Sequence, residues 1–285
     1  MTRRIDAHHH VWDLAVRDQP WIVGEAMERV RRSFDIDEYA VQTQACGVAA
    51  SVVVQTVADI SETEELLDLA AATPLVAGVV GWADLAAANV GDQLDRLRAR
   101  PSGMWLVGIR SLVQYEPDPA WLSRPAVLAG LREVARRGLV NEFVVLPHQL
   151  GAVLGAVNEV TESHFVLDHL AKPQIASGAW EPWATDMSAL AQCANVSAKL
   201  SGLVTEAGWS NWTADDVRPY VDHALSAFGP ERLVFGSDWP VCTLAASYRQ
   251  VVELAEQLID GLSAGEQAAC MGGNAAKVYS LQETR

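Results

Sequence analysis

Cysteine is scarce in this sequence, and its four occurrences lie far apart in the chain, at Cys46, Cys193, Cys242 and Cys270. No two of them form the C-x-x-C pair that is typical of structural zinc sites and redox-active thiols. The sequence therefore predicts neither a disulfide framework nor a cysteine-ligated zinc. Scattered thiols favour a reducing location, and we expect the protein in the cytoplasm.

Positive charge and long apolar runs are also lacking. The chain has 21 lysines and arginines against 36 acidic residues, a formal net charge of −15. It has no basic cluster large enough to bind a phosphate backbone or phosphate headgroups, so we expect neither nucleic acid nor an anionic membrane surface as a partner. No apolar run approaches the ~20 residues that span a bilayer, and the first residues lack the apolar stretch of a secretory leader.

Short β-branched runs alternate with helix-patterned segments along the whole chain. Eight runs have the length and apolar character of strands in a parallel sheet covered by helices; they span residues 4–11, 50–55, 76–82, 106–110, 142–146, 164–169, 196–201 and 232–237. Asp35 and Thr213 are expected helix N-caps, and residues 61–64 (SETE) have the form of a capping box. Gly138 and Gly229 are expected helix stops.

Eight β-then-α units in one chain of 285 residues predict a single (β/α)8 barrel domain over residues 1–285. A doubly wound open sheet is the alternative, but the glycine-rich phosphate turn expected after its first strand is absent. The segment beyond the eighth strand, residues 244–285, is longer than one helix needs. We expect Asn274 to cap a final helix, AAKVYSL, that packs on the outside of the barrel.

Two histidines of the run RIDAHHHVWDL are candidates for an active site, which in this fold lies where the C-terminal ends of the strands meet. His8 and His10 are two residues apart and share one face of the first strand. His9 is expected to point to the other face, toward the helices, together with Ile5, Ala7 and Val11. Two imidazoles on one buried face are costly without a function, so we favour a functional role for the pair.

Other polar residues are expected at the same edge. Asp238 ends the run VFGSDWP after the eighth strand, and closure of the barrel would bring it beside the first strand. His169 ends the sixth strand in FVLDHLAKP, and its neighbour Asp168 is expected to point away from it as a structural hydrogen-bond partner. The remaining polar candidates would contact substrate or be solvated charges: Arg110, His148, Lys172 and Lys199.

Tryptophan is abundant, with ten residues against five phenylalanines. Trp12 and Trp239 adjoin the strand ends that carry the candidate catalytic residues. Four more follow the sixth and seventh strands: Trp180, Trp183, Trp209 and Trp212. A tryptophan face packs well on the C–H surface of a sugar, so we predict that Trp12 and Trp239 contact substrate. The alternative for each tryptophan is that it seals the top of a helix.

Several motifs in the right order resemble the amidohydrolase superfamily: IDAHHHVWD, GIRS, FVLDHLAKP, AKLSGL, FGSDWPVC and GGNAAKVYSL. The closest resemblance is to its amidohydrolase-related (amidohydrolase 2) branch, which contains sugar lactonases such as L-fuconolactonase and L-rhamnonolactonase. The resemblance covers essentially the whole chain. It implies a hydrolase of carbohydrate metabolism, in L-fucose catabolism, that opens a small L-fuconolactone-like sugar lactone. The catalytic residues that it implies are His8, His10, His169 and Asp238.

The departures from the superfamily pattern concern metal. Two-metal members bridge their ions with a carboxylated lysine from the fourth or fifth strand, whereas these strands end here in Arg110 and in Pro147-His148. The resemblance therefore implies no two-metal centre, and the lactonase branch requires no divalent metal. A single zinc remains chemically reasonable, with ligands of the types zinc prefers: His8, His10, His169 and Asp238.

The roles that follow are those of lactone hydrolysis. Asp238 would activate water, and the three histidines would hydrogen-bond the carbonyl oxygen. One alternative is a zinc-dependent decarboxylase of an unsaturated or aromatic acid. A second is a pyrone-dicarboxylate lactonase, which would need several converging arginines where this chain offers Arg110. A third is a ligand-binding barrel without turnover, for which a general base such as Asp238 would be superfluous.

Overall fold

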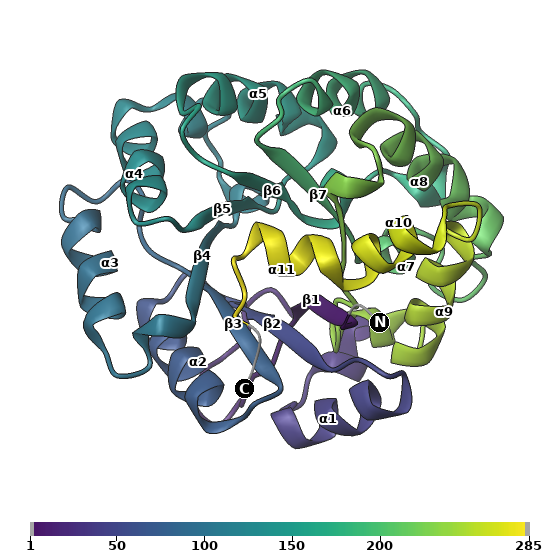
Figure 1. The fold of residues 1–285 in the computed structure, drawn as a ribbon, viewed down its shortest axis with the longest axis horizontal. Coiled ribbons are helices and arrows are strands. Elements are labelled where there is room, and N and C mark those ends of the chain that lie inside the picture. Colours follow the sequence, from purple (N-terminus) through teal and green to yellow (C-terminus); the bar gives the residue numbers. More distant parts are fainter. Residues whose placement is uncertain (1–2, 283–285) are drawn as a thin grey trace.

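A computed structural model of the protein describes residues 3–282, so the predicted domain limits at residues 1 and 285 lie outside the described residues. Within them, eight parallel strands pair in sequence order around a central axis (Figure 1). They are β1 (Ile5–His9), β2 (Ala50–Val54), β3 (Val76–Gly81), β4 (Leu106–Ser111), β5 (Val140–Phe143), β6 (Phe165–Leu167), β7 (Val196–Leu200) and β8 (Leu233–Phe235). The ring closes just beyond β8, where the amide of Asp238 donates to the carbonyl of His8 (2.8 Å). The predicted (β/α)8 barrel is confirmed.

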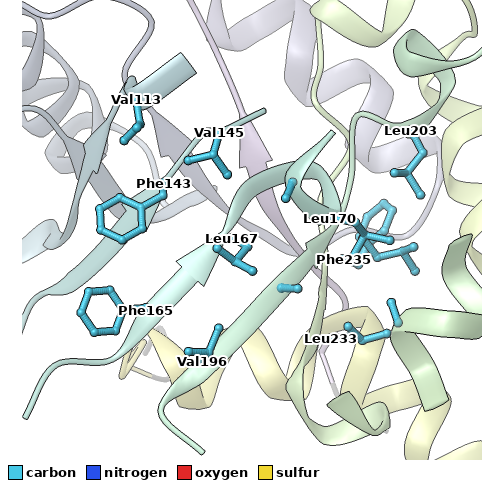
Figure 2. Close-up of a cluster of buried hydrophobic side chains, with 14 of the residues drawn as sticks. Val113, Phe143, Val145, Phe165, Leu167, Leu170, Val196, Leu203, Leu233 and Phe235 are labelled. Carbon is cyan, nitrogen blue, oxygen red and sulfur yellow. The ribbon is translucent and has the colours of Figure 1, made fainter. Parts of the chain in front are cut away.

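A ring of helices surrounds the strands (Figure 1). The larger ones are α1 (Ile36–Ala45), α2 (Ile60–Ala72), α3 (Val90–Ala99), α4 (Pro125–Arg136), α5 (Leu150–Glu159), α6 (Trp183–Ala191), α8 (Ala214–Phe228) and α9 (Tyr248–Leu258). Three short helices are α7 (Leu203–Glu206), α10 (Ala264–Ala268) and α11 (Asn274–Val278). Large side chains fill the layer between strands and helices, where Phe143 and Phe165 stack with ring centroids 5.6 Å apart (Figure 2). Smaller valines and alanines fill the barrel interior.

Most of the predicted helix ends are confirmed. Asp35 caps α1 by accepting the amide of the third helical residue, and Thr213 is the N-cap residue of α8. Gly138 and Gly229 follow α4 and α8 with φ angles of 68° and 73°. Left-handed φ values of this kind are the reason why glycine ends helices.

The capping box predicted at residues 61–64 is wrong. Asp59 caps α2 instead, since its carboxylate accepts the amide (2.9 Å) and the hydroxyl (2.8 Å) of Ser61. A carboxylate two residues upstream thus takes the place that the serine would have filled. Glu62 is buried and accepts the backbone amide of Thr56 (2.9 Å), which ties α2 to the end of β2.

The alternation of inward and outward side chains in strand β1 is interrupted within its five residues. Its register with β2 shifts between Asp6 and His9. Before the shift, Ile5 and Ala7 pack in the cluster inside the barrel. After it, His9 points outward and stacks on Tyr39 of α1, with ring centroids 3.8 Å apart. The predicted direction of His9 is confirmed, but the prediction that Ile5 and Ala7 share its face is wrong, because alternation does not continue through such an irregularity.

Helix α11 closes the barrel at the N-terminal ends of the strands, and Figure 1 shows it crossing the barrel opening. Ala275 and Tyr279 pack in the interior cluster. The prediction that this helix lies on the outside is therefore wrong. Asn274 is the first residue of α11 and does not cap it. Its side-chain amide donates to the carbonyls of Pro230 and Leu233 (both 2.7 Å), so it ties the helix to the start of β8.

The four cysteines are free thiols. Among residues 3–282, no helix has both the length and the apolar character that a membrane span needs.

Candidate active site

A cavity of about 230 Å³ opens at the C-terminal ends of the strands. Five of the polar residues that the sequence singled out line it: His10, Arg110, His169, Lys172 and Asp238. Pockets for drug-sized ligands range over roughly 300–1,000 Å³. The smaller volume here suits a compact substrate of about one ring.

His8, His10 and Asp238 meet where β1 adjoins β8. The Nε2 atoms of the two histidines are 3.1 Å apart. Asp238 Oδ1 lies 3.4 Å from His10 Nε2 and 3.7 Å from His8 Nε2. Gly236 permits this approach, because a Cβ atom there would lie 2.5 Å from the Cβ of His8. His8 is fully buried beneath the cavity, so His10 and Asp238 are the members of this group that face the space above.

His169 begins an unusual left-handed turn. The φ angles of His169, Leu170, Ala171 and Lys172 lie between 49° and 58°. Left-handed helical backbone costs non-glycine residues roughly 1–2 kcal/mol each. The turn is held by the complete burial of Leu170 and Ala171 and by Trp183, whose Nε1 donates to the Leu170 carbonyl (2.7 Å). Such strain, maintained by the surrounding packing, is typical of functional sites.

The left-handed turn presents the His169 ring to the end of β7. His169 Nδ1 lies 2.9 Å from the hydroxyl of Ser201. The next residue, Gly202, has φ 63°, and a Cβ atom there would lie 2.4 Å from the same ring nitrogen. The ring centroid of His169 is 4.6 Å from that of His8. His169 therefore joins the group formed by β1 and Asp238 from the opposite side.

Asp168 does not point away from His169, contrary to prediction. Its carboxylate approaches His8 Nδ1 (3.3 Å) and Arg110 Nη1 (3.1 Å), and His169 offers a ring nitrogen within 4.8 Å of the same group. The prediction assumed that strand alternation continues to His169, whereas β6 ends at Leu167. Asp168 thus lies at the base of the site.

Lys199 lies inside the barrel and not on the cavity wall, so the predicted substrate contact is corrected. Its side chain is fully buried. The ammonium Nζ is 2.6 Å from Glu142 Oε2, 3.1 Å from Asp168 Oδ1 and 3.1 Å from His8 Nδ1. The sequence analysis did not single out Glu142 of β5, although a lone acidic residue in the apolar run LVNEFVVL is a usable sign of an interior partner.

Three other predicted contacts lie away from the cavity. His148 is exposed in the turn that follows β5. Trp12 and Trp239 are buried on either side of Phe34, with ring centroids 5.2 Å and 5.4 Å from its ring. Both rings support the C-terminal ends of β1 and β8 from the side away from the cavity. Their packing matches the alternative interpretation, that such tryptophans seal the structure.

Other aromatic residues line the cavity instead, and the sequence did not single out two of them. Trp21 and Tyr115 come from the loops after β1 and β4, and Trp209 comes from the loop after α7. Trp21 Nε1 donates to the side chain of Gln19 (2.7 Å), and Trp209 Nε1 donates to the Thr205 carbonyl (2.8 Å). These bonds fix two indole rings at the cavity. The concentration of tryptophan in loops was the available sign, but sequence alone does not show which rings face inward.

Electrostatics leave Asp238 as an ionised carboxylate beside the uncharged rings of His8 and His169. Burial lowers the pKa of His169 to about 4. Burial, with Lys199 nearby, also lowers the pKa of His8 well below its usual range. Burial acts to raise the pKa of Asp238, but His169, His10 and Lys172 outweigh it and hold that pKa below its ordinary value. At neutral pH, Asp238 is therefore a carboxylate that can accept a proton.

The same residues offer ligands for one metal ion. His8, His10 and Asp238 each present one ligand atom, and these atoms lie 3.1–3.7 Å apart. Zn–N and Zn–O bonds of ~2.0–2.1 Å in a tetrahedral site separate the ligand atoms by about 3.4 Å, so this set fits zinc. His169 belongs to a second group, with His8 and Asp168. The four ligands that the sequence predicted are thus divided between two groups that share His8.

Comparison with known proteins agrees with this geometry. The sequence profile of the amidohydrolase family matches residues 5–281. An L-fucono-1,5-lactonase from Burkholderia multivorans is 38% identical over 291 residues, a match that covers 98% of this chain and 97% of that protein. An L-fucono-1,5-lactonase from Burkholderia ambifaria is 36% identical, over 99% of this chain and 97% of its own.

A solved structure shows the same arrangement of the chain. The crystal structure of an amidohydrolase from Burkholderia multivorans with bound zinc superposes with a TM-score of 0.92 at 37% identity, covering 98% of this chain and 100% of that one. The family profile spans the barrel from β1 to the residues after α11. The chain belongs to the amidohydrolase family.

Proposed function

We propose that this protein is a lactonase, a carboxylic ester hydrolase that opens an L-fuconolactone-like aldonolactone to the aldonic acid without requiring a metal. The observation that carries the proposal is Asp238, an ionised carboxylate that lines a cavity of one-ring size beside imidazoles. Near full-length similarity to two L-fucono-1,5-lactonases supports the same reaction. The free thiols of the chain suit the cytoplasm, where we place the enzyme.

In the proposed mechanism Asp238 takes a proton from water as the water attacks the lactone carbonyl carbon. A lactone is an activated ester, so a carboxylate base and good oxyanion donors suffice. Once protonated, Asp238 returns the proton to the ring oxygen as the C–O bond breaks. No proton is gained or lost by the enzyme over the cycle, and the aldonic acid then ionises in solution.

Arg110 and His169 are the proposed donors to the oxyanion. Arg110 lines the cavity, and its Nε finds no acceptor among the described residues although it is buried. The hydroxyl of Ser201 can donate to His169 Nδ1, which leaves Nε2 protonated. Donors held in place before the reaction stabilise developing negative charge most effectively. His10 lines the cavity beside Asp238, and His8 supports both from below.

The cavity wall favours a neutral polyol over a dicarboxylate. Lys172 is paired with Glu206 (3.4 Å), and Arg110 is paired with Asp168 (3.1 Å), so both cations of the cavity are already compensated. A pyrone dicarboxylate would need cations without such partners. A paired lysine and glutamate instead offer both donors and acceptors to hydroxyl groups, and Trp21 and Trp209 offer faces for C–H surfaces.

A zinc-dependent decarboxylase of an unsaturated or aromatic acid is the second candidate, because His8, His10 and Asp238 fit a zinc ion. A bound zinc would supply a Lewis acid that polarises a substrate oxygen. In that case Asp238 would be a metal ligand and could not serve as the free base of the first mechanism. The two candidates therefore assign incompatible roles to one carboxylate.

Proton release on a panel of five- and six-membered aldonolactones, before and after stripping with a strong chelator, tests the proposal. We expect rapid hydrolysis that survives stripping, with L-fuconolactone among the best substrates. Hydrolysis that disappears on stripping and returns with zinc would refute the metal-independent mechanism. A lack of hydrolysis of every lactone, with carbon dioxide released from an aromatic acid, would establish the second candidate.

A further inference from the structure

The buried ion-pair cluster beneath the cavity has no direct place in the mechanism above. It consists of Lys199, Glu142 and Asp168, whose side chains have no exposed surface. It begins at the closed end of the barrel, where the hydroxyl of Tyr279 donates to Glu142 Oε1 (2.5 Å). It ends at His8, which touches the cavity-lining residues His10 and Asp238. Lys199 is the link between the two ends.

The N–H donors of the Lys199 ammonium determine which ring nitrogen of His8 can carry a proton. An ammonium has three N–H donors and no acceptor. The three nearest partners of Nζ are Glu142 Oε2 (2.6 Å), Asp168 Oδ1 (3.1 Å) and His8 Nδ1 (3.1 Å). Nζ donates to Glu142 and, when His8 Nδ1 is a bare acceptor, to His8, whereas its contact with Asp168 Oδ1 is an ion pair without hydrogen-bond geometry. A proton on Nδ1 would face the ammonium and remove one of these two acceptors.

The other side of His8 agrees with this assignment. His10 Nδ1 lies 2.7 Å from the Val54 carbonyl, which can only accept, so Nδ1 carries a proton. In the uncharged ring, His10 Nε2 is then an acceptor for the proton on His8 Nε2, 3.1 Å away. Arg110 Nη1 also approaches His8 Nε2, but at 3.4 Å, whereas it donates to Asp168 Oδ2 at 3.1 Å. One chain of donors thus runs from Lys199 through His8 to His10.

We propose that Lys199 is a positioning residue that holds His8 in the Nε2-protonated tautomer and so withholds from a divalent cation one of three available ligands. A metal ligand needs a bare nitrogen, and His8 Nε2 is bare only when Nδ1 carries the proton. Asp168 Oδ1, 3.3 Å from Nδ1, would accept that proton if Lys199 were absent. A carboxylate behind the imidazole is the usual support of a metal-bound histidine. This inference does not depend on lactone hydrolysis.

The tautomer can be observed directly in the wild-type protein. Long-range ¹H–¹⁵N correlation spectra of protein labelled at histidine distinguish protonated from bare ring nitrogens, and His8→Gln identifies the His8 signals. We expect Nε2 of His8 to be protonated and Nδ1 to be bare. The opposite pattern in metal-stripped protein would overturn the proposal without any variant of Lys199.

Zinc affinity tests the consequence, measured on metal-stripped protein by competition with a chromophoric chelator. Changes behind a metal-bound histidine alter affinity by roughly 10–100-fold, so we expect Lys199→Met to bind zinc at least about tenfold more tightly than wild type. The double variant Lys199→Met/Glu142→Gln removes one charge of each sign, and the glutamine keeps an acceptor for Tyr279. We expect the same gain in this variant, with circular dichroism and melting to confirm its fold.

Lys172→Met is the matched control for charge alone. Lys172 lies beside the same cavity and pairs with Glu206, whereas Lys199 contacts His8 directly. We expect its effect on zinc affinity to stay below about threefold. An equal gain in Lys172→Met and Lys199→Met, or no gain in the folded double variant, would show that Lys199 does not act through the tautomer of His8.

Discussion

The two ends of the barrel contrast in what fills them. The end closed by α11 is largely apolar, with Ala275 and Tyr279 packed against the interior valines and Glu142 accepting the hydrogen bond of the Tyr279 hydroxyl. The open end carries buried charge and left-handed backbone, in Asp168, Asp238 and the turn that begins at His169. The contrast indicates that stability is concentrated at the closed end and chemistry at the open end, where costly features are maintained by the rest of the fold. Substitutions at each end should therefore separate activity from stability.

The largest expected effect is on activity, at the open end. Asp238→Asn keeps the shape of the side chain but removes the proposed base. General base catalysis is worth about 10²–10⁴ in rate, so we expect kcat/KM for the best lactone to fall by about 10³. The free energy of unfolding should fall only slightly, because the lowered pKa of Asp238 shows that the folded protein favours its charged form. Initial rates and urea denaturation measure the two quantities.

Retention of more than a tenth of the wild-type rate in Asp238→Asn would remove Asp238 from the role of base. A collapse of stability together with activity would contradict the division between the two ends. His148→Ala is the matched control, because the structure places that exposed side chain away from the cavity. Its rate should match that of wild type within about twofold, since surface substitutions are usually nearly neutral.

The next effect is on stability, at the closed end. Tyr279→Ala leaves a large void among the interior side chains, and truncation of a buried aromatic costs about 3–5 kcal/mol. We expect a loss of about 3 kcal/mol in the free energy of unfolding, with KM changed less than threefold at a temperature where the variant stays folded. Tyr279→Phe removes only the hydrogen bond to Glu142 and should cost about 1 kcal/mol. A larger change in KM than in stability would place Tyr279 among the functional residues.

How far the sequence predicts the open end depends on the regularity of the backbone. His8 and His10 were predicted to share a face because they are two residues apart in an apolar strand, and their Nε2 atoms are 3.1 Å apart. The same rule failed for Ile5 and Ala7, since the register of β1 shifts between Asp6 and His9. Alternation is a reliable guide only within an unbroken stretch of strand.

The left-handed turn could not be predicted from the backbone propensities of its residues. Nothing in the sequence HLAK suggests positive φ, because such residues ordinarily avoid it. The turn exists because tertiary packing buries Leu170 and Ala171 and binds the Leu170 carbonyl. The inward direction of Lys199 escaped prediction for a related reason. A lysine is normally solvated, and only the partners on β5 and β6, Glu142 and Asp168, make its burial tolerable.

A pH dependence of stability would sharpen the contrast between the ends. Burial lowers the pKa of His169 from an ordinary 6.5 to about 4. Between these values the unfolded chain binds a proton that the folded protein does not, so stability rises with pH from about 4 to 6.5 and is level above. The pKa difference corresponds to about 3 kcal/mol at most. His169→Asn should lose this part of the slope in urea denaturation of metal-stripped protein between pH 4.5 and 7.5, and an unchanged slope would contradict the buried, uncharged state of His169.

The smallest effect tests how the cavity recognises its substrate. Lys172 and Glu206 form a pair 3.4 Å apart on the cavity wall, where Lys172 helps to lower the pKa of Asp238 but has no place in the proposed proton transfer. A hydrogen bond that involves a charged group is worth about 1.5–3 kcal/mol, so Lys172→Met should raise KM for a polyhydroxylated lactone by about tenfold and leave kcat within threefold. A simple lactone without hydroxyl groups should show no such change in KM, because it gives the pair nothing to bind. If both lactones lost the same factor in kcat, Lys172 would act on the reaction itself, and the recognition of the sugar would have to reside in the faces of Trp21 and Trp209 and in the polar groups that line the remaining wall.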